Sequence, residues 1–252
     1  MIPLDDRGLT LGDGLFETIL GKDGELVLLD EHLARLARGC AVLGLPAPDL
    51  AEAGRLCREA VLPGRCAVRL TVTAGGGGRG LDRPAAPEPR LFATAAPAPA
   101  PGPARLITAS ARRNEGSPAS RLKTLSYLDN ILAREAARAA GADEALMLNN
   151  AGDVACAAVA NIFWVEGQTL FTPALECGVL DGIMRDQVLK AAPNLGLKPV
   201  ETRARREQIV AADEIFLTNS LIGVRPVSNL DDYQPPNTGA SRAISALLHS
   251  LS

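Results

Sequence analysis

A lysine in an apolar stretch is the first residue of this sequence that could do covalent chemistry. The chain has four lysines, at positions 22, 123, 190 and 198, and Lys123 lies in RLKTLSYLDN, just before an amphipathic helical pattern. A lysine in such a place commonly covers apolar neighbours with its long stem. In a partly apolar pocket it can instead lose its proton and attack a carbonyl group. Both interpretations are open from this segment alone.

Two segments of the second half could bind a phosphate group. In LDGIMRDQVL, Gly182 precedes a helical pattern, which leaves the amides of Ile183 and Met184 as donors at the positive end of a helix dipole. In EIFLTNS, the polar residues Asn219 and Ser220 follow an apolar strand pattern. An ordinary loop-to-helix entry and an ordinary strand end explain these patterns as well.

The elements that position these segments follow from hydrophobic periodicity. In the first half the pattern predicts a hairpin of strands 15–20 and 25–29, a helix capped by Asp30, a helix over 50–61 and a strand in CAVRLTVTAG. GGGGRG then reads as a turn, and strands are expected at 91–95 and 104–110. In the second half, helices are expected over 127–140, 183–192, 206–211 and 241–251, and strands over 144–148, 152–156, 161–165, 169–171, 198–201 and 213–220.

This mixture of helices and short strands predicts an α+β protein of two domains. The polar, Gly- and Pro-containing segment ARRNEGSPAS, residues 111–120, is the expected boundary. We therefore expect an N-terminal α/β domain over 1–112, a linker over 113–119 and a C-terminal β-barrel-like domain over 120–252.

Composition excludes several classes of function. A formal net charge of -3 gives no global field for nucleic acid or anionic membrane, and no apolar run has the length of a spanning helix. Five cysteines without a CxxC pair fit a reducing cytoplasm better than a disulfide framework. The two histidines, His32 and His249, lie far apart in sequence, so no metal site is expected.

The order of the motifs is more specific than any one of them. GDGLFE, HLARL, GGRG, LKTLSYLDN, DEALMLN, ANIFW, LDGIMR and EIFLTNS follow one another over residues 6–227. This series resembles the class IV aminotransferases, which are the fold type IV enzymes that use pyridoxal 5′-phosphate (PLP). The resemblance implies a two-domain architecture with a smaller N-terminal α/β domain and a C-terminal pseudo-barrel. It also implies a homodimer that acts on a small-molecule amino substrate.

Roles for individual residues come from this resemblance. Lys123 matches the lysine that attaches the cofactor aldehyde and moves a substrate proton, and Arg35 in HLARL matches the arginine that binds the cofactor phosphate. The amides at the Gly182 helix start, those of Ile183 and Met184, match further phosphate ligands, as does Ser220 beside Asn219.

Two more residues match substrate contacts of some relatives. Tyr127 falls near an active-site aromatic residue, and Arg79 in GGRG matches an arginine that faces a substrate carboxylate. A solvated loop charge is the other interpretation of Arg79, because glycine-rich turns commonly carry exposed arginine.

One position departs from the family pattern. A glutamate normally stands beside the pyridine nitrogen of PLP, just before the A-N-x-F-W segment, and this sequence has Cys156 there. Asp153 lies three residues earlier, so in a strand its side chain points to the opposite face. A neutral thiol offers no fixed negative charge, which weakens the cofactor as an electron sink.

Three functions are compatible with this pattern. GGRG, LKTL and the compact length favour an aminodeoxychorismate lyase of the folate pathway, which releases pyruvate from 4-amino-4-deoxychorismate and leaves 4-aminobenzoate. A D-amino-acid or branched-chain aminotransferase is the second interpretation. The third, motivated by Cys156, is a PLP-binding homologue with impaired catalysis.

Overall fold

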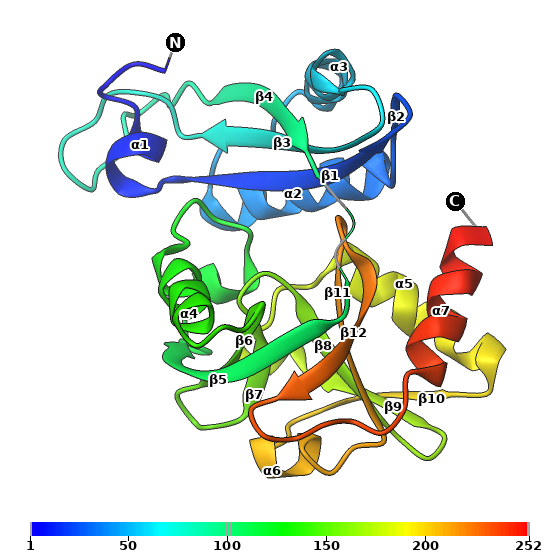
Figure 1. Ribbon diagram of the computed structural model, residues 1–252. Helices are drawn as coiled ribbons and strands as arrows, with labels where there is room; N and C mark the ends of the chain where they lie inside the picture. The colour runs from blue at the N-terminus through cyan, green and yellow to red at the C-terminus, as the bar shows by residue number, and fades with distance from the viewer. Residues whose placement is uncertain (1, 99, 101, 251–252) are drawn as a thin grey trace. The chain divides into compact units, whose positions relative to one another are not determined.

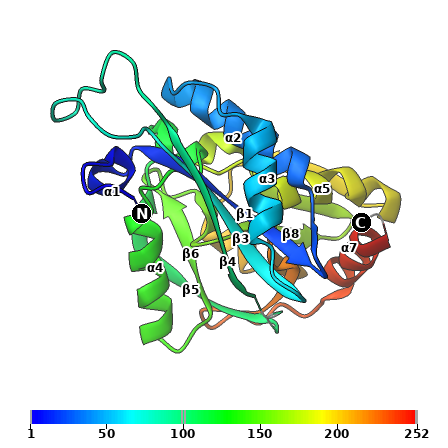
Figure 2. The same cartoon turned by 90° about the horizontal axis from the view of Figure 1, so that it is seen from above.

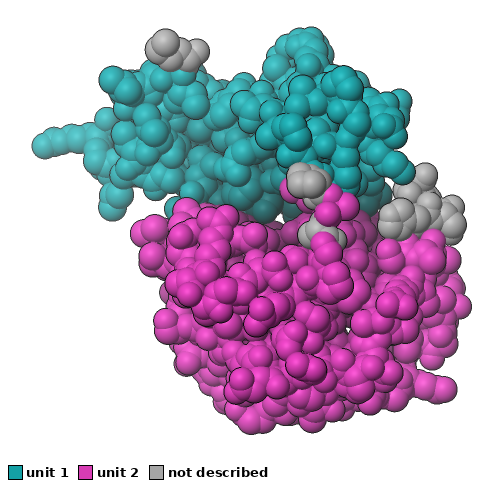
Figure 3. Space-filling model, in the orientation of Figure 1, with its two compact units in different colours: residues 1–99, 122–126 teal, residues 100–121, 127–252 magenta. Residues whose placement is uncertain are grey.

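The computed structural model describes residues 2–98, 100 and 102–250, and these form two compact units. Unit 1 contains the chain up to residue 99 together with Leu122–Ser126, and unit 2 contains residues 100–121 and 127–252 (Figure 3). Both units mix helices and strands, so the expected α+β class is confirmed (Figure 1).

Unit 1 is built on a four-stranded antiparallel sheet. Its strands are β1 (Gly14–Lys22), β2 (Glu25–Leu26), β3 (Arg65–Thr73) and β4 (Arg90–Pro97), in the order β2-β1-β3-β4. The predicted hairpin is confirmed, and its turn places Asp23 and Gly24 at φ 53° and 91°, as a tight two-residue connection requires.

Two helices cover one face of this sheet, and a short one precedes it (Figure 2). They are α2 (Leu29–Leu43) and α3 (Leu50–Ala60), and their apolar sides share a core with Leu15, Ile19 and Val68 of the strands. The short helix is α1 (Arg7–Leu11).

The start of α2 corrects a sequence prediction. Asp30 does not cap this helix, because the N-cap is Leu28, which has a left-handed backbone with φ 54°. Asp30 and Glu31 lie in the first turn instead, where their charges favour the positive end of the helix dipole.

Unit 2 contains a curled eight-stranded sheet of mixed direction (Figure 1). In sheet order its strands are β10 (Lys198–Thr202), β9 (Thr169–Pro173), β8 (Asn161–Glu166), β11 (Glu214–Asn219), β12 (Gly223–Leu230), β5 (Ala104–Arg113), β6 (Glu144–Asn149) and β7 (Val154–Ala157). The helices of this unit are α4 (Leu128–Ala139), α5 (Ile183–Ala191), α6 (Arg206–Ile209) and α7 (Gly239–Ser250). Strand β12 is an element that hydrophobic periodicity did not predict.

The compact units differ from the expected domain ranges at two places. Strand β5, expected in the N-terminal domain and its linker, pairs in parallel with β6 and β12 and so belongs to unit 2. The segment Leu122–Ser126, expected in the C-terminal domain, belongs to unit 1. Both differences arise from hydrogen bonds between segments that are distant in sequence. No helix among the described residues is long and apolar enough to cross a membrane.

Candidate active site

Lys123 is held by backbone pairing along the first residues of β1. The Phe16 amide donates to the Lys123 carbonyl oxygen at 2.9 Å, and the Leu125 amide donates to the Gly14 carbonyl oxygen at 3.0 Å. These two bonds place residues 123–125 beside the edge of the unit 1 sheet. The lysine therefore occupies a defined position.

The Lys123 side chain lies against an aromatic ring and close to other charges. Its Nζ is 4.2 Å from the centre of the Phe16 ring, and the Arg69 guanidinium carbon is 3.7 Å from the same centre. Burial lowers the pKa of the Lys123 ammonium to about 8, with Arg35 and Arg69 acting in the same direction and Glu17 opposing them. An amine with this pKa is unprotonated in about a tenth of the molecules at pH 7, and the unprotonated form is the nucleophile.

A buried carboxylate of β1 organises Arg35. Glu17 is 1% exposed and accepts two hydrogen bonds from Arg35, from Nε to Oε1 at 2.9 Å and from Nη2 to Oε2 at 2.6 Å. Burial raises the pKa of Glu17, but the bonds from Arg35 and His32 outweigh that effect and hold it below its usual range. An arginine expected to bind a phosphate thus shares its guanidinium with a protein carboxylate.

His32 completes this cluster from the same face of α2. Its Nδ1 lies 2.7 Å from Glu17 Oε2, and its ring is fully buried. Burial lowers the pKa of His32, so the neutral ring donates from Nδ1 to the carboxylate. Its Nε2 has no hydrogen-bond partner in the described part of the chain. The sequence pattern did not single out Glu17 or His32 for this role.

Arg79 lies in an exposed loop of unit 1, between β3 and β4. Its backbone exchanges hydrogen bonds with Asp82, from Arg79 N to Asp82 O at 3.1 Å and from Asp82 N to Arg79 O at 3.0 Å. The side chain is exposed. This exposure is compatible with both interpretations of Arg79, as a substrate contact and as a solvated loop charge.

In unit 2, the start of α5 is packed tightly against strand β8. Gly182 is the N-cap, and a Cβ added there would lie 2.0 Å from the Asn161 side-chain oxygen. The other side-chain atom of that amide, Nδ2, donates to the Leu180 carbonyl oxygen at 3.0 Å. Within the described residues no side chain caps this helix, which leaves the amides of Ile183 and Met184 suited to an anion.

The end of β11 lies beside this helix start. Thr218 pairs with Asn161 across the two strands, so their side chains share one face of the sheet. The Thr218 hydroxyl is fully buried and has no hydrogen-bond partner among the described residues. A hydroxyl in such a place can donate a hydrogen bond to a ligand oxygen.

The two residues that follow differ in what their side chains do. The Asn219 side chain is hydrogen-bonded to the backbone of its own unit. Its Nδ2 donates to the Val159 carbonyl oxygen at 2.9 Å, and its Oδ1 accepts from the amides of Leu221 and Ile222. Ser220 is half-buried. Ser220 therefore suits the expected phosphate contact better than Asn219 does.

Cys156 is buried in an apolar cluster on β7. The thiol is 7% exposed and packs with Ala155, Met147 and Cys177. Burial raises its pKa, so the thiol stays neutral. Asp153 does not replace the missing glutamate, because its carboxylate lies 3.4 Å from the Arg205 Nε.

Tyr127 stands at the N-cap of α4, where its carbonyl oxygen accepts from the Ile131 amide at 3.0 Å. It is the first residue of unit 2 after the Lys123 segment. Within unit 1 the structure thus groups Lys123 with the charges of Glu17, Arg35 and Arg69. Within unit 2 it groups Gly182, Asn161 and Thr218.

Comparison with known proteins identifies the family. The family model for amino-transferase class IV matches residues 14–230. The chain belongs to the class IV aminotransferase family. Class IV aminotransferases are PLP enzymes, so this protein is a PLP-dependent lyase or aminotransferase.

Individual relatives carry different activities. A protein of Methanocaldococcus jannaschii, provisionally named a branched-chain-amino-acid aminotransferase, is 35% identical over 242 residues, covering 90% of this chain and 81% of the relative. The aminodeoxychorismate lyase of Bacillus subtilis is 29% identical over 239 residues, covering 90% and 80%. The crystal structure of 4-amino-4-deoxychorismate lyase from Pseudomonas aeruginosa superposes with a TM-score of 0.90 at 32% identity, covering 99% of this chain and 95% of that one.

Each unit by itself contains groups whose chemistry suits one part of PLP. A lysine of lowered pKa suits the aldehyde, and the uncapped α5 amides beside the unpartnered Thr218 hydroxyl suit the phosphate. The neutral thiol of Cys156 does not supply the negative charge that a protonated pyridine nitrogen requires.

Proposed function

We propose that this protein is an aminodeoxychorismate lyase, which converts 4-amino-4-deoxychorismate to pyruvate and 4-aminobenzoate. The observation that carries the proposal is the buried, neutral Cys156 at the family's glutamate position. Without a negative charge there, reactions that need strong carbanion stabilisation lose most. Loss of pyruvate from this substrate forms an aromatic ring, and that driving force reduces the help required from the cofactor.

Bound PLP supplies an aldehyde that captures the substrate amine and a ring that accepts electron density. Lys123 would hold that aldehyde, and its amine would take a proton from the substrate and return it. A pKa of about 8 suits an amine that must do both near neutral pH. In this proposal Arg35, the amides of Ile183 and Met184, and Ser220 bind the phosphate.

Arg79 is the proposed contact for a substrate carboxylate. Its guanidinium offers paired donors that match the two carboxylate oxygens. Its side chain on the loop between β3 and β4 is exposed and so is accessible to a substrate. The proposed substrate carries carboxylates and, as a small amino compound, requires no nucleic acid or membrane partner.

Incubation of the purified, PLP-loaded protein with 4-amino-4-deoxychorismate tests the lyase directly. We expect 4-aminobenzoate and pyruvate in equal amounts, and a Lys123→Ala variant prepared in parallel should form neither. Turnover of D-alanine or leucine with the bound cofactor converted to its amine form, and no 4-aminobenzoate, would overturn the proposal.

An aminotransferase, which would turn over D-alanine or leucine in this way, is the alternative function. The 35% identity to the M. jannaschii relative favours it, because that identity exceeds the 29% to the B. subtilis lyase. The half-reaction with a single amino acid separates the two activities, since a lyase releases its product without leaving the amino group on the cofactor.

We also propose that the protein is a homodimer, as the family pattern implies. Helix α4 supports this with Leu128, Ile131 and Leu132, which are 66%, 55% and 55% exposed and lie on one helix face. An exposed apolar stripe of this kind is typical of a surface covered by another chain.

A further inference from the structure

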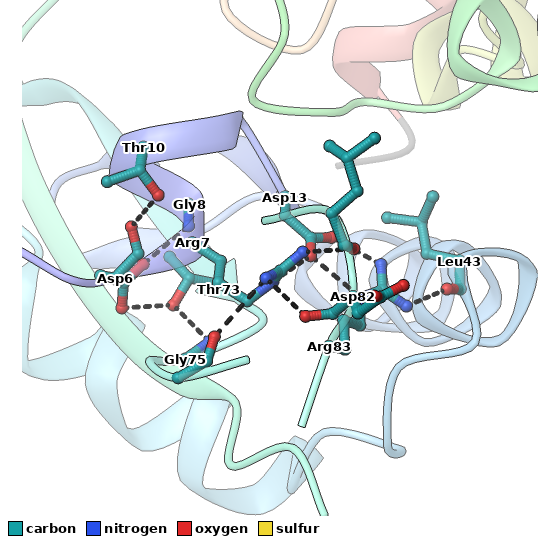
Figure 4. Close-up of polar contacts among 12 residues, drawn as sticks. Asp6, Arg7, Gly8, Thr10, Asp13, Leu43, Thr73, Gly75, Asp82 and Arg83 are labelled. Carbon is teal, nitrogen blue, oxygen red and sulfur yellow. Dashed lines mark hydrogen bonds and ion pairs between the residues drawn. The ribbon is translucent and has the colours of Figure 1, made fainter. Parts of the chain in front are cut away.

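The carbonyl groups of the loop between β3 and β4 converge on one buried side chain, that of Arg7 (Figure 4). Arg7 Nη1 donates to the carbonyl oxygens of Gly80 at 3.2 Å and Asp82 at 3.1 Å, and Nη2 donates to that of Leu81 at 2.9 Å. Its Nε donates to Asp13 Oδ2 at 2.9 Å. Three consecutive residues of the loop are therefore bound by one guanidinium.

Arg7 is 4% exposed, so the charge of its guanidinium must be balanced inside the protein. Asp13 balances it and is itself bound by Arg83, whose hydrogen bonds hold the Asp13 pKa below its usual value against the effect of burial. Arg83 Nη1 also donates to the Leu43 carbonyl oxygen at 2.6 Å, which joins the end of the loop to the end of α2. The loop is thus anchored at its middle and at its end.

The glycines of the loop permit this close approach. Gly78 has φ 82°, and a Cβ added there would lie 2.1 Å from the Asp82 carbonyl oxygen and 3.1 Å from Arg7 Nη1. A side chain at this position would push the loop away from the guanidinium. The side chains that the loop does carry at its tip, Arg79 and Leu81, are exposed.

We propose that Arg7 is a positioning residue, which fixes the 77–82 loop in the conformation that holds Arg79 ready for a substrate carboxylate. Arg7 itself does not contact the substrate. Its effect on the reaction passes through Arg79, so this inference rests on the substrate role proposed for Arg79 above. The clamp on the loop can be tested separately from that role.

Trypsin provides a test that does not depend on activity. Between β3 and β4, Arg79–Gly80 is the one bond that trypsin can cleave, because Arg83 is followed by Pro84. Cleavage requires the loop to detach and extend, and Arg7→Lys replaces a fork of donors by a point charge. In the PLP-loaded protein we expect Arg7→Lys to speed the cut at Arg79, located by mass spectrometry, about tenfold or more.

Two further variants separate loop release from general loosening. Gly78→Ala keeps Arg7 but crowds the loop, and it should speed the same cut. Arg90→Lys is the matched control, since Arg90 donates to Asp6 in the same polar cluster without touching the loop carbonyls. Its cut at Arg79 should stay within about twofold of the wild-type rate. Equal rates in the wild type, Arg7→Lys and Gly78→Ala would overturn the clamp.

Kinetics test the positioning role. With whichever of 4-amino-4-deoxychorismate, D-alanine or leucine the wild type turns over, Arg79→Ala and Arg7→Lys should each raise KM several-fold more than they lower kcat. In the Arg79→Ala background, Arg7→Lys should add little. Additive effects would overturn the positioning role. An Arg79→Ala variant with unchanged KM would overturn it as well, by removing the substrate role of Arg79, while lyase turnover and the proteolysis result would still stand on their own.

Discussion

Arg35 and Glu17 form a two-point ion pair, in which Nε donates to Oε1 at 2.9 Å and Nη2 donates to Oε2 at 2.6 Å. Glu17 also raises the pKa of Lys123, whereas burial, Arg35 and Arg69 lower it. The Glu17 carboxylate thus orients Arg35, the expected phosphate ligand, and partly offsets the lowering of the Lys123 pKa.

Replacing Glu17 by glutamine should therefore lower the pKa of Lys123 below about 8. Glutamine keeps the size of the side chain and removes its charge, which leaves the positive charges of Arg35 and Arg69 unopposed. Competitive labelling of lysines in the cofactor-free protein at pH 7 measures this, with the exposed Lys22 and Lys198 as internal references. We expect Lys123 labelling to rise several-fold, to at most about tenfold.

Glu52→Gln is the control for this experiment, because Glu52 lies on the exposed side of α3 and pairs with Arg55. Its Lys123 labelling should match that of the wild type. A Glu17→Gln protein that labels like the control would show that Glu17 has no electrostatic effect on the lysine.

Lys123→Met should stabilise the cofactor-free protein in a pH-dependent way. The folded-state pKa of Lys123, about 8, lies below its ordinary value, so the lysine destabilises the fold fully below pH 8 and ceases to do so above about pH 10.5. Removing it should add roughly 1–3 kcal/mol at pH 7, a gain that vanishes as the pH rises through that window. Urea unfolding at pH 7, 9 and 10.5 measures it, and a constant gain across the series would contradict the pKa shift.

Local sequence patterns account for most of the elements. The hairpin of β1 and β2 and the helices α3, α4 and α5 are confirmed near their predicted bounds, because turn residues and apolar periodicity act over a few residues. Strand β12 escaped prediction, since GVRPVSNL contains a proline and little alternation. Its pairing with β11 and β5 arises from segments distant in sequence.

In the candidate site, too, some residues stand in local motifs and others are brought together only by contacts between distant segments. Lys123, Arg35 and the Gly182 helix start stand in motifs that the sequence displays. Glu17 could have been noticed as a charge on the core-facing side of an alternating strand, and His32 as the residue one helical turn before Arg35. Their contact joins residues 15 to 18 positions apart, and only the packing of α2 on β1 brings them together.

Cys156→Glu should increase aminotransferase chemistry. A carboxylate at this position supplies the negative charge that a protonated pyridine nitrogen needs, and a hydrogen bond to a charged group contributes about 1.5–3 kcal/mol. With D-alanine or leucine we expect the half-reaction to speed up about tenfold or more, with a shift in the absorbance of the bound cofactor.

Cys156→Gln is the matched control, since glutamine has the size of glutamate without its charge. It should show neither the gain nor the absorbance shift. If Cys156→Glu left the spectrum and turnover of the wild type unchanged, residue 156 would not govern the cofactor ring.

The exposed stripe on α4 predicts how the proposed dimer can be broken. Ile131 stands in the middle of the stripe, between Leu128 and Leu132, and is 55% exposed within one chain. Ile131→Glu would place an unpaired charge in an apolar interface, a change that typically costs several kcal/mol. Light scattering after gel filtration should give the mass of two chains for the wild type and of one chain for the variant at micromolar concentration.

Lys190→Glu is the control for this experiment, because it changes an exposed charge on α5 and should leave the mass unchanged. A dimer that survives Ile131→Glu would place the interface elsewhere, and a monomeric wild type would remove the homodimer proposal altogether.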